Sequence, residues 1–300
     1  MNAKPVTGIV TMIVRRLIGI TMAVIGLFLM TACSSQSVLG GSAIKQDASA
    51  AQQKAAEELG IPVEKTLPKS GIVLRFIPAG TFLMGSPKTE KERMEDETQH
   101  KVTLTNAFYI GKYEVTQGQW KTVMGSNPSC FTNSGDNAPV EMVSWHDCTN
   151  FMRKLAALEG MQEGLFRLPT EAEWEYACRA GTTTAFCYGD DLDTSMATFI
   201  GKNESRRKTV PTVPVGKFKP NALGLYDMHG NVLEWCENWY YYYKGHETNP
   251  TGPATGACRV LRGGSWDEGA DDLRSALRAN DDMDSKLNSY GFRLCMPTGP

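Results

Sequence analysis

The sequence predicts an α+β domain with little regular secondary structure. Glycine occurs 29 times and proline 15 times, and this content of turn-forming residues argues against long helices and coiled coils. From Gly71 onward, short strand-like runs alternate with turns and with a few short helices. Hydrophobic residues make up 41% of the chain and charged residues 21%, so the composition is that of a globular protein rather than a disordered one.

The first 32 residues are typical of an export signal. They contain three basic residues and no acidic one, and their apolar run over residues 17–30 is shorter than the roughly 20 residues that span a bilayer. The run ends in Thr31-Ala32-Cys33-Ser34, which resembles the lipobox of bacterial lipoproteins. The resemblance implies that Cys33 is lipidated and anchors the mature chain to the bacterial membrane. The alternative is a plain signal that is cut near Ala32.

The residues after Cys33 are expected to connect the anchor to the domain. Ser34 in place of an Asp resembles the outer-membrane sorting pattern, so we expect an envelope protein at the outer membrane, facing the periplasm or the surface. Residues 33–68 are predicted to be the lipidated cysteine and a flexible tether. Residues 48–59 could form a short helix, but its mostly alanine face is too small to anchor a core. The folded domain is predicted to span residues 69–300.

Charge and cysteine content restrict the possible partners. Lys and Arg number 31 and Asp and Glu 33, so the formal charge of −2 predicts no general binding to nucleic acid. Apart from Cys33 there are seven cysteines, and an odd number in an oxidising compartment leaves at least one free or paired between chains. The sequence contains no Cys-x-x-Cys and no His-x-x-x-His, so a zinc site is not supported.

Strands are expected near both ends of the domain. Residues 72–77 form a hydrophobic run that stops at Pro78, and residues 81–84 are its predicted partner. The segment 194–243 is expected to be loop-like because prolines and glycines interrupt it. Further strands are predicted at residues 102–104, 108–115, 260–262 and 291–294.

Three short amphipathic helices are predicted after capping boxes, in which a Ser or Thr and a residue three positions later satisfy each other's backbone amides. Apolar residues then follow at helical spacing, as with Cys148, Phe151 and Leu155. We expect these helices to cover the core. The three pairs are Thr116 with Gln119, Ser144 with Asp147, and Thr170 with Glu173.

Seven ordered motifs then extend through the domain: Phe76–Ser86, Tyr113–Thr116, Pro139–Trp145, Arg167–Ala177, Gly224–Trp235, Arg259–Trp266 and Gly291–Arg293. In sequence and order they resemble the formylglycine-generating enzyme, or sulfatase-modifying factor, family. The resemblance implies that family's variant of the C-type-lectin fold, with low regular secondary structure.

Aerobic enzymes of that family oxidise a sulfatase cysteine to formylglycine with Cu(I) held by a pair of cysteines, since soft thiolates suit this ion. Here the two positions match Ala270 and Ser275, and no cysteine occurs between Cys258 and Cys295. Copper is therefore not expected. Leu233 also replaces a tryptophan of the family motif.

The same resemblance supports a calcium site, although it does not support a copper site. It implies a structural Ca²⁺ held by Asp227, by the carbonyls of Gly230 and Val232, and by Glu234, a mixture of oxygen ligands that suits a hard cation. The alternative is that Glu234 only accepts hydrogen bonds from backbone amides.

A ligand-binding face is also implied, where the family binds its substrate. The aromatic surface of Trp266 and the guanidinium groups of Arg274 and Arg278, with Ser275 between them, suit an extended peptide or an anionic ligand. The alternative is that the arginines pair internally with Asp271, Asp272 or Asp282.

Three functions remain open. They are a non-catalytic module that binds a peptide, protein or small ligand, an oxidase that makes formylglycine or catalyses a related oxidation, and a scaffold for envelope assembly. The segment 266–290 also resembles the hypervariable ligand face of lectin-fold proteins. The missing copper cysteines favour the binding module.

Overall fold

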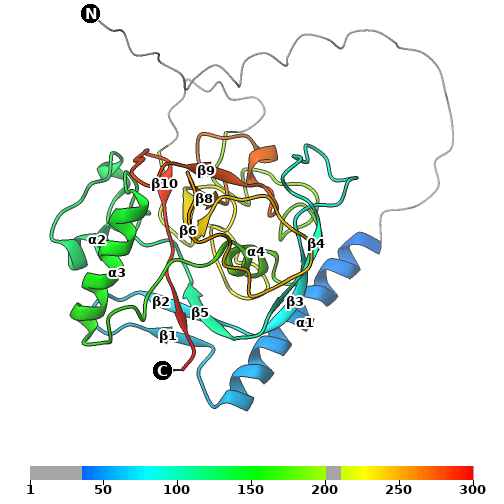
Figure 1. The fold of residues 1–300 in the computed structure, drawn as a ribbon, viewed down its shortest axis with the longest axis horizontal. Coiled ribbons are helices and arrows are strands. Elements are labelled where there is room, and N and C mark those ends of the chain that lie inside the picture. The colour runs from blue at the N-terminus through cyan, green and yellow to red at the C-terminus, as the bar shows by residue number, and fades with distance from the viewer. Residues whose placement is uncertain (1–35, 201–210, 300) are drawn as a thin grey trace, which may run out of the picture. The chain divides into compact units, whose positions relative to one another are not determined.

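A computed structural model describes residues 36–200 and 211–299, and Figure 1 shows their arrangement. The predicted signal, Cys33 and its lipidation lie outside the described residues. Among the residues described, none of the helices combines the length and apolar character that crossing a membrane requires. The α-helices are α1 (Gln36–Leu59), α2 (Gln117–Met124), α3 (Trp145–Glu159) and α4 (Glu171–Arg179), and the 3₁₀ turns are η1 (Thr132–Ser134) and η2 (Ala270–Leu273).

The strands form three small sheets with the orders β1-β2-β5-β11, β10-β6-β8-β9 and β3-β4-β7. Most neighbours are antiparallel, but β10 with β6 and β4 with β7 are parallel. The strands are β1 (Glu64–Thr66), β2 (Val73–Ile77), β3 (Gly80–Met84), β4 (His100–Leu104), β5 (Phe108–Gly111), β6 (Leu233–Trp239), β7 (Glu247–Thr248), β8 (Arg259–Arg262), β9 (Ala279–Asp281), β10 (Tyr290–Gly291) and β11 (Cys295–Pro297). The prediction of an α+β fold with short elements is confirmed.

The three predicted capping boxes are all present, at the starts of α2, α3 and α4. In each, the side chain of the cap residue accepts a hydrogen bond from the backbone three residues on, and the reciprocal bond is also made. The buried faces of α2 and α3 join a core in which Trp120 stacks on Phe151, with ring centres 5.2 Å apart, and Phe292 meets both rings edge-on. These helices cover the core, as expected.

The predicted tether is wrong from about residue 48 onward, because α1 and β1 pack on the domain. Gln52 and Ala56 are buried in α1, and Leu67 is buried after β1. The Gln52 side-chain amide donates to the carbonyls of Phe76 (2.6 Å) and Leu223 (3.1 Å). Small alanines allow the helix to approach closely, and a buried polar side chain supplies the specific contact. A count of apolar area alone could not detect this.

Strand β6 corrects a second prediction, since it lies inside the segment 194–243 that was expected to be loop-like. It is an interior strand of its sheet, paired with β8 on one side and β10 on the other. Trp235 and Cys236 at its centre are fully buried.

The strand predicted at 108–115 ends earlier, at Gly111, where a Cβ atom would meet the carbonyl of Tyr113.

We expect Gln52→Ala to lower the free energy of unfolding by about 2 kcal/mol, because two buried carbonyls lose their donor. Gln53→Ala is the matched control, since Gln53 is the exposed neighbour on the same helix. Urea unfolding of both variants measures the difference. Equal, small effects would mean that α1 does not dock as described.

Candidate functional site

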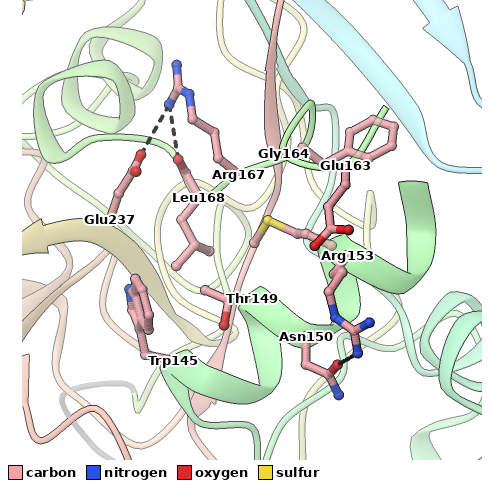
Figure 2. Close-up of a pocket in the computed structure, with 11 residues that line it drawn as sticks. Trp145, Thr149, Asn150, Arg153, Glu163, Gly164, Arg167, Leu168 and Glu237 are labelled. Atoms are coloured by element: carbon pink, nitrogen blue, oxygen red, sulfur yellow. Dashed lines mark hydrogen bonds and ion pairs between the residues drawn. The ribbon is translucent and has the colours of Figure 1, made fainter. Parts of the chain in front are cut away.

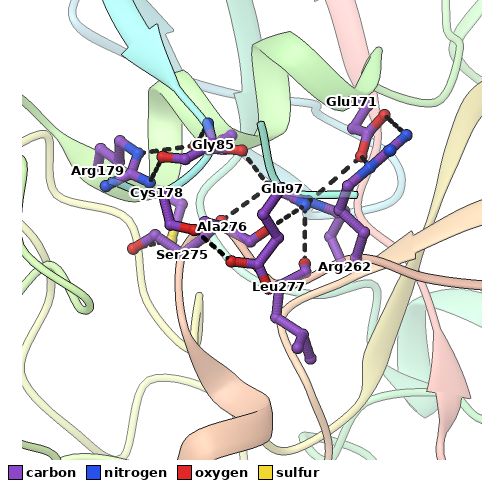
Figure 3. Close-up of polar contacts among 12 residues, drawn as sticks. Gly85, Glu97, Glu171, Cys178, Arg179, Arg262, Ser275, Ala276 and Leu277 are labelled. Atoms are coloured by element: carbon purple, nitrogen blue, oxygen red, sulfur yellow. Dashed lines mark hydrogen bonds and ion pairs between the residues drawn. The ribbon is translucent and has the colours of Figure 1, made fainter. Parts of the chain in front are cut away.

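A buried arginine on β8 organises the region where the family's chemistry would take place (Figure 3). Arg262 donates to Glu175 on α4 and to the carbonyls of Ser275 (2.7 Å) and Leu277 (2.7 Å). A second carboxylate of α4, Glu171, lies 3.5 Å from the same guanidinium group. Burial would lower the pKa of Arg262, but Glu175 and the other nearby acids raise it, so the charge is retained.

Arg274 does not present a free guanidinium group, contrary to the predicted ligand face. It is buried and donates to both oxygens of Glu97, at 2.7 and 2.8 Å, and to Glu90 at 2.7 Å. Burial would lower the pKa of Arg274, but these hydrogen bonds raise it. The guanidinium group of Arg274 is thus engaged by Glu97 and Glu90, which corrects the expectation that it is exposed, and ligand binding by Arg274 stays a prediction.

Arg278 is likewise occupied within the protein. Its Nε and Nη2 donate to the two oxygens of Glu171, at 2.6 and 2.9 Å, and its guanidinium carbon lies 4.0 Å from the ring centre of Tyr243. Burial opposes ionisation of Glu171, but Arg278 and Arg262 keep its pKa below the usual value. The alternative of internal pairing is thus correct in kind, although the carboxylate partners are glutamates distant in sequence. Of the three predicted aspartates, Asp271 is contacted by Arg274, whose Nε donates to its backbone carbonyl at 3.1 Å.

The other two residues of the predicted face are also enclosed. The Trp266 indole N–H donates to the carbonyl of Asn288 (3.0 Å), and its ring meets Phe131 edge-on. Ser275 is fully buried, with its hydroxyl 3.7 Å from the sulfur of Cys178. Ala270 opens the turn η2. The four residues therefore support the fold and do not form an open pocket.

Two of the predicted calcium ligands carry carboxylates, and both already have protein partners. Glu234 accepts hydrogen bonds on both oxygens from Arg293, each 2.6 Å long, and one from the Trp174 indole at 2.8 Å. Asp227 accepts a 2.7 Å bond from the amide of Gly216. Gly230 and Val232 lie between them, and their amides donate to Gly263 and Glu114.

Among the residues that the structure describes, negative charge exceeds positive charge around this loop. Burial, and then repulsion by Asp227 and Glu234, raise the pKa of Glu114 well above its ordinary value. Burial also raises the pKa of Asp227 to about 6, against the lowering effects of the Gly216 amide and Arg293. Within the described residues, the Arg293 guanidinium group bonds Glu234 and acts on Glu114 and Asp227 only through its charge, which favours either protonation of these acids or a bound cation.

Burial disfavours the thiolate form of three buried cysteines. Burial raises the pKa of Cys178 to about 12 and the pKa values of Cys236 and Cys295 well above the ordinary value, so these thiols stay protonated at neutral pH. The seven cysteines from Cys130 to Cys295 are unpaired in the part of the chain that the structure describes. Sequence reasoning missed His229, whose Nε2 lies 3.7 Å from Cys178.

The fold is shared with a solved structure, Treponema denticola variable protein 1. The two superpose with a TM-score of 0.67 at 30% identity, over 79% of this chain and 99% of the other. Together with the seven motifs, this likeness defines a lectin-like domain of the sulfatase-modifying type.

The family model for the sulfatase-modifying factor enzyme 1-like domain matches residues 62–297, and the chain belongs to this family. The match begins before residue 69, in agreement with the packing of β1. The chain is 38% identical to the formylglycine-generating enzyme of Streptomyces coelicolor over 172 residues, which cover 52% of each protein. It is 34% identical to the serine/threonine-protein kinase pkn1 of Chlamydia caviae, over 73% of this chain but only 37% of the kinase.

The raised pKa of Asp227 predicts a pH dependence of stability in the presence of a chelator. The folded state holds this proton more tightly than the unfolded state, so the stabilisation is complete below the unfolded pKa and is lost as pH rises through about 6. At about 1.4 kcal/mol per pKa unit, the loss is about 2 to 3 kcal/mol.

Asp227→Asn should remove this contribution, and the difference between wild type and variant isolates it from other groups. Urea unfolding between pH 4 and 7 measures it, with exposed Asp191→Asn as the control. A wild-type minus variant difference that stays constant over this range would contradict the assignment.

Proposed function

We propose that this protein is a cell-envelope lipoprotein whose sulfatase-modifying-factor domain binds a peptide or small ligand without copper oxidase chemistry. The observation that carries the proposal is the pair of positions Ala270 and Ser275, where the family's enzymes hold Cu(I). Neither side chain supplies a thiolate, and the thiol of Cys178, which lies 3.7 Å from the Ser275 hydroxyl, has a raised pKa. An enzyme with relocated thiolates is the alternative.

The segment 266–290 suits a partner with positive charge better than the anionic one first expected. It carries seven acids and three bases, and two of those bases, Arg274 and Arg278, are buried in ion pairs. Asp271, Asp282 and Asp284 are exposed. The solved relative from Treponema denticola is called a variable protein, and this supports a display role for a rim on this fold.

A structural calcium ion is part of the same proposal. Among the described residues, no three His, Cys, Asp or Glu side chains are grouped so that they could hold a metal. The ion would therefore need the carbonyls of Gly230 and Val232 beside Asp227, with Glu234 shared with Arg293. The buried excess of negative charge at Glu114 and Asp227 supports this.

For the calcium proposal, addition of CaCl₂ to chelator-treated protein at pH 7 should raise the melting temperature by several degrees. Asp227→Asn should abolish the rise, because it removes the carboxylate not engaged by Arg293. A melting temperature that is the same in chelator and in millimolar calcium would count against the ion.

For the absence of oxidase chemistry, the purified protein should bind no Cu(I) tightly. It should leave a Cys-x-Pro-x-Arg peptide unmodified under air with reductant, as followed by mass spectrometry. The Streptomyces coelicolor enzyme is the positive control. Conversion of the peptide thiol to an aldehyde by this protein would overturn the proposal and direct attention to Cys236, Cys258 and Cys295.

For the lipid anchor, Cys33→Ser should leave the precursor uncleaved and unlabelled by a radioactive fatty acid. Membrane fractionation and gel mobility measure processing, with Cys130→Ser as the control because Cys130 lies outside the lipobox. Normal cleavage and membrane retention of Cys33→Ser would refute lipidation there.

A further inference from the structure

A cavity separate from both predicted sites lies between α3, the loop after it and the end of β6 (Figure 2). Its volume is about 430 Å³, which is the size of a small-molecule site. None of its lining residues belongs to the predicted ligand face or to the loop from Asp227 to Glu234. It therefore needs a separate explanation.

The floor of the cavity is apolar and firmly held. Met152 on α3 and the loop residues Phe166 and Leu168 line it. All three side chains also pack into the hydrophobic core and are almost fully buried. Trp145 forms one wall. Its indole N–H donates to the carbonyl of Cys236 (3.0 Å), and the guanidinium group of Arg259 lies 3.9 Å from its ring centre. A ring or alkyl group can enter without reorganising these walls.

The charged rim contains a carboxylate that lacks a hydrogen-bond donor. Glu237 on β6 is 47% exposed, and its nearest cation, Arg167, is 3.7 Å away. Arg167 is already engaged, because it donates two 2.7 Å bonds to Glu173 and one to the carbonyl of Leu168. Within residues 36–200 and 211–299, no donor lies within hydrogen-bond distance of the Glu237 carboxylate.

Three further charged side chains lie at or beside the rim of the cavity: Glu163, Arg153 and Arg259. Glu163 has no ion pair within the described part of the chain, whereas Glu237 is paired with Arg167 at 3.7 Å. Arg153 is exposed and donates to Asn150 at 2.9 Å. With Arg167 neutralised by Glu173, the carboxylates of Glu163 and Glu237 stand against the guanidinium groups of Arg153 and Arg259, and Arg259 donates to the backbone carbonyl of Glu237. The rim is therefore close to neutral, and the feature that favours a cation is the Glu237 carboxylate, which lacks a hydrogen-bond donor.

We propose that this cavity binds a small primary amine that carries an apolar group, with its ammonium at Glu237 and its apolar group on Met152, Phe166 and Leu168. The inference goes beyond the proposed function, because the cavity is independent of the copper positions and of segment 266–290. It holds whether or not the domain catalyses an oxidation.

Three probes with the same ring and different charge test the proposal on the full mature chain: 2-phenylethylamine, 2-phenylethanol and phenylacetate. Isothermal titration calorimetry measures affinity, and the NMR signal of the Met152 methyl group reports the location. The amine should bind at least about tenfold more tightly than the alcohol and the acid, as expected for a charge-assisted hydrogen bond. Its binding should shift the Met152 signal.

Glu237→Gln should weaken amine binding about tenfold and leave alcohol binding unchanged, because only the charge is removed. Glu57→Gln, on the exposed surface of α1, is the control with the same change in net charge. Thr149→Phe should fill the cavity and abolish binding of all three probes, with circular dichroism confirming the fold. Tightest binding of phenylacetate, equal binding of the three probes, no binding at millimolar concentration, or an amine affinity insensitive to Glu237→Gln would each overturn the proposal.

Discussion

The charge of Arg262, buried without solvent, is the constraint on which the rest of the structure depends. A guanidinium group in this position is tolerated only if carboxylates and carbonyls surround it, and α4 and the chain after η2 provide both. Removing one partner would leave an uncompensated charge, at a typical cost of about 3 to 5 kcal/mol. The position of α4 against β8 and the path of residues 275–277 follow from this requirement.

Features with a local cause could be predicted from the sequence. The capping boxes at Thr116, Ser144 and Thr170 require only residues three positions apart, and each begins a helix as expected. Strand β2 and its stop at Pro78 depend on neighbouring residues in the same way. The family and its fold followed from ordered motifs, because each motif identifies a local structure that the family shares.

Features that depend on distant partners could not be predicted. Arg274 reaches Glu97, 177 positions earlier, and Gln52 reaches the carbonyl of Leu223, 171 positions later. Nothing near these residues in the sequence distinguishes a buried ion pair from a ligand-binding arginine. The same limit applies to Glu237. Its carboxylate lacks a hydrogen-bond donor because Arg167 donates to Glu173 and stays 3.7 Å from Glu237. The motifs therefore located the candidate site, but the prediction that its arginine side chains are exposed was wrong.

The contact between Ser275 and Cys178 has a consequence for redox chemistry. A hydroxyl faces the thiol at 3.7 Å, so a covalent cross-link between these two positions cannot form, whatever the reduction potential outside the cell. The junction between α4 and the last third of the domain is instead held by ion pairs and hydrogen bonds to carbonyls. The hold between these two positions is therefore the same in reducing and in oxidising surroundings.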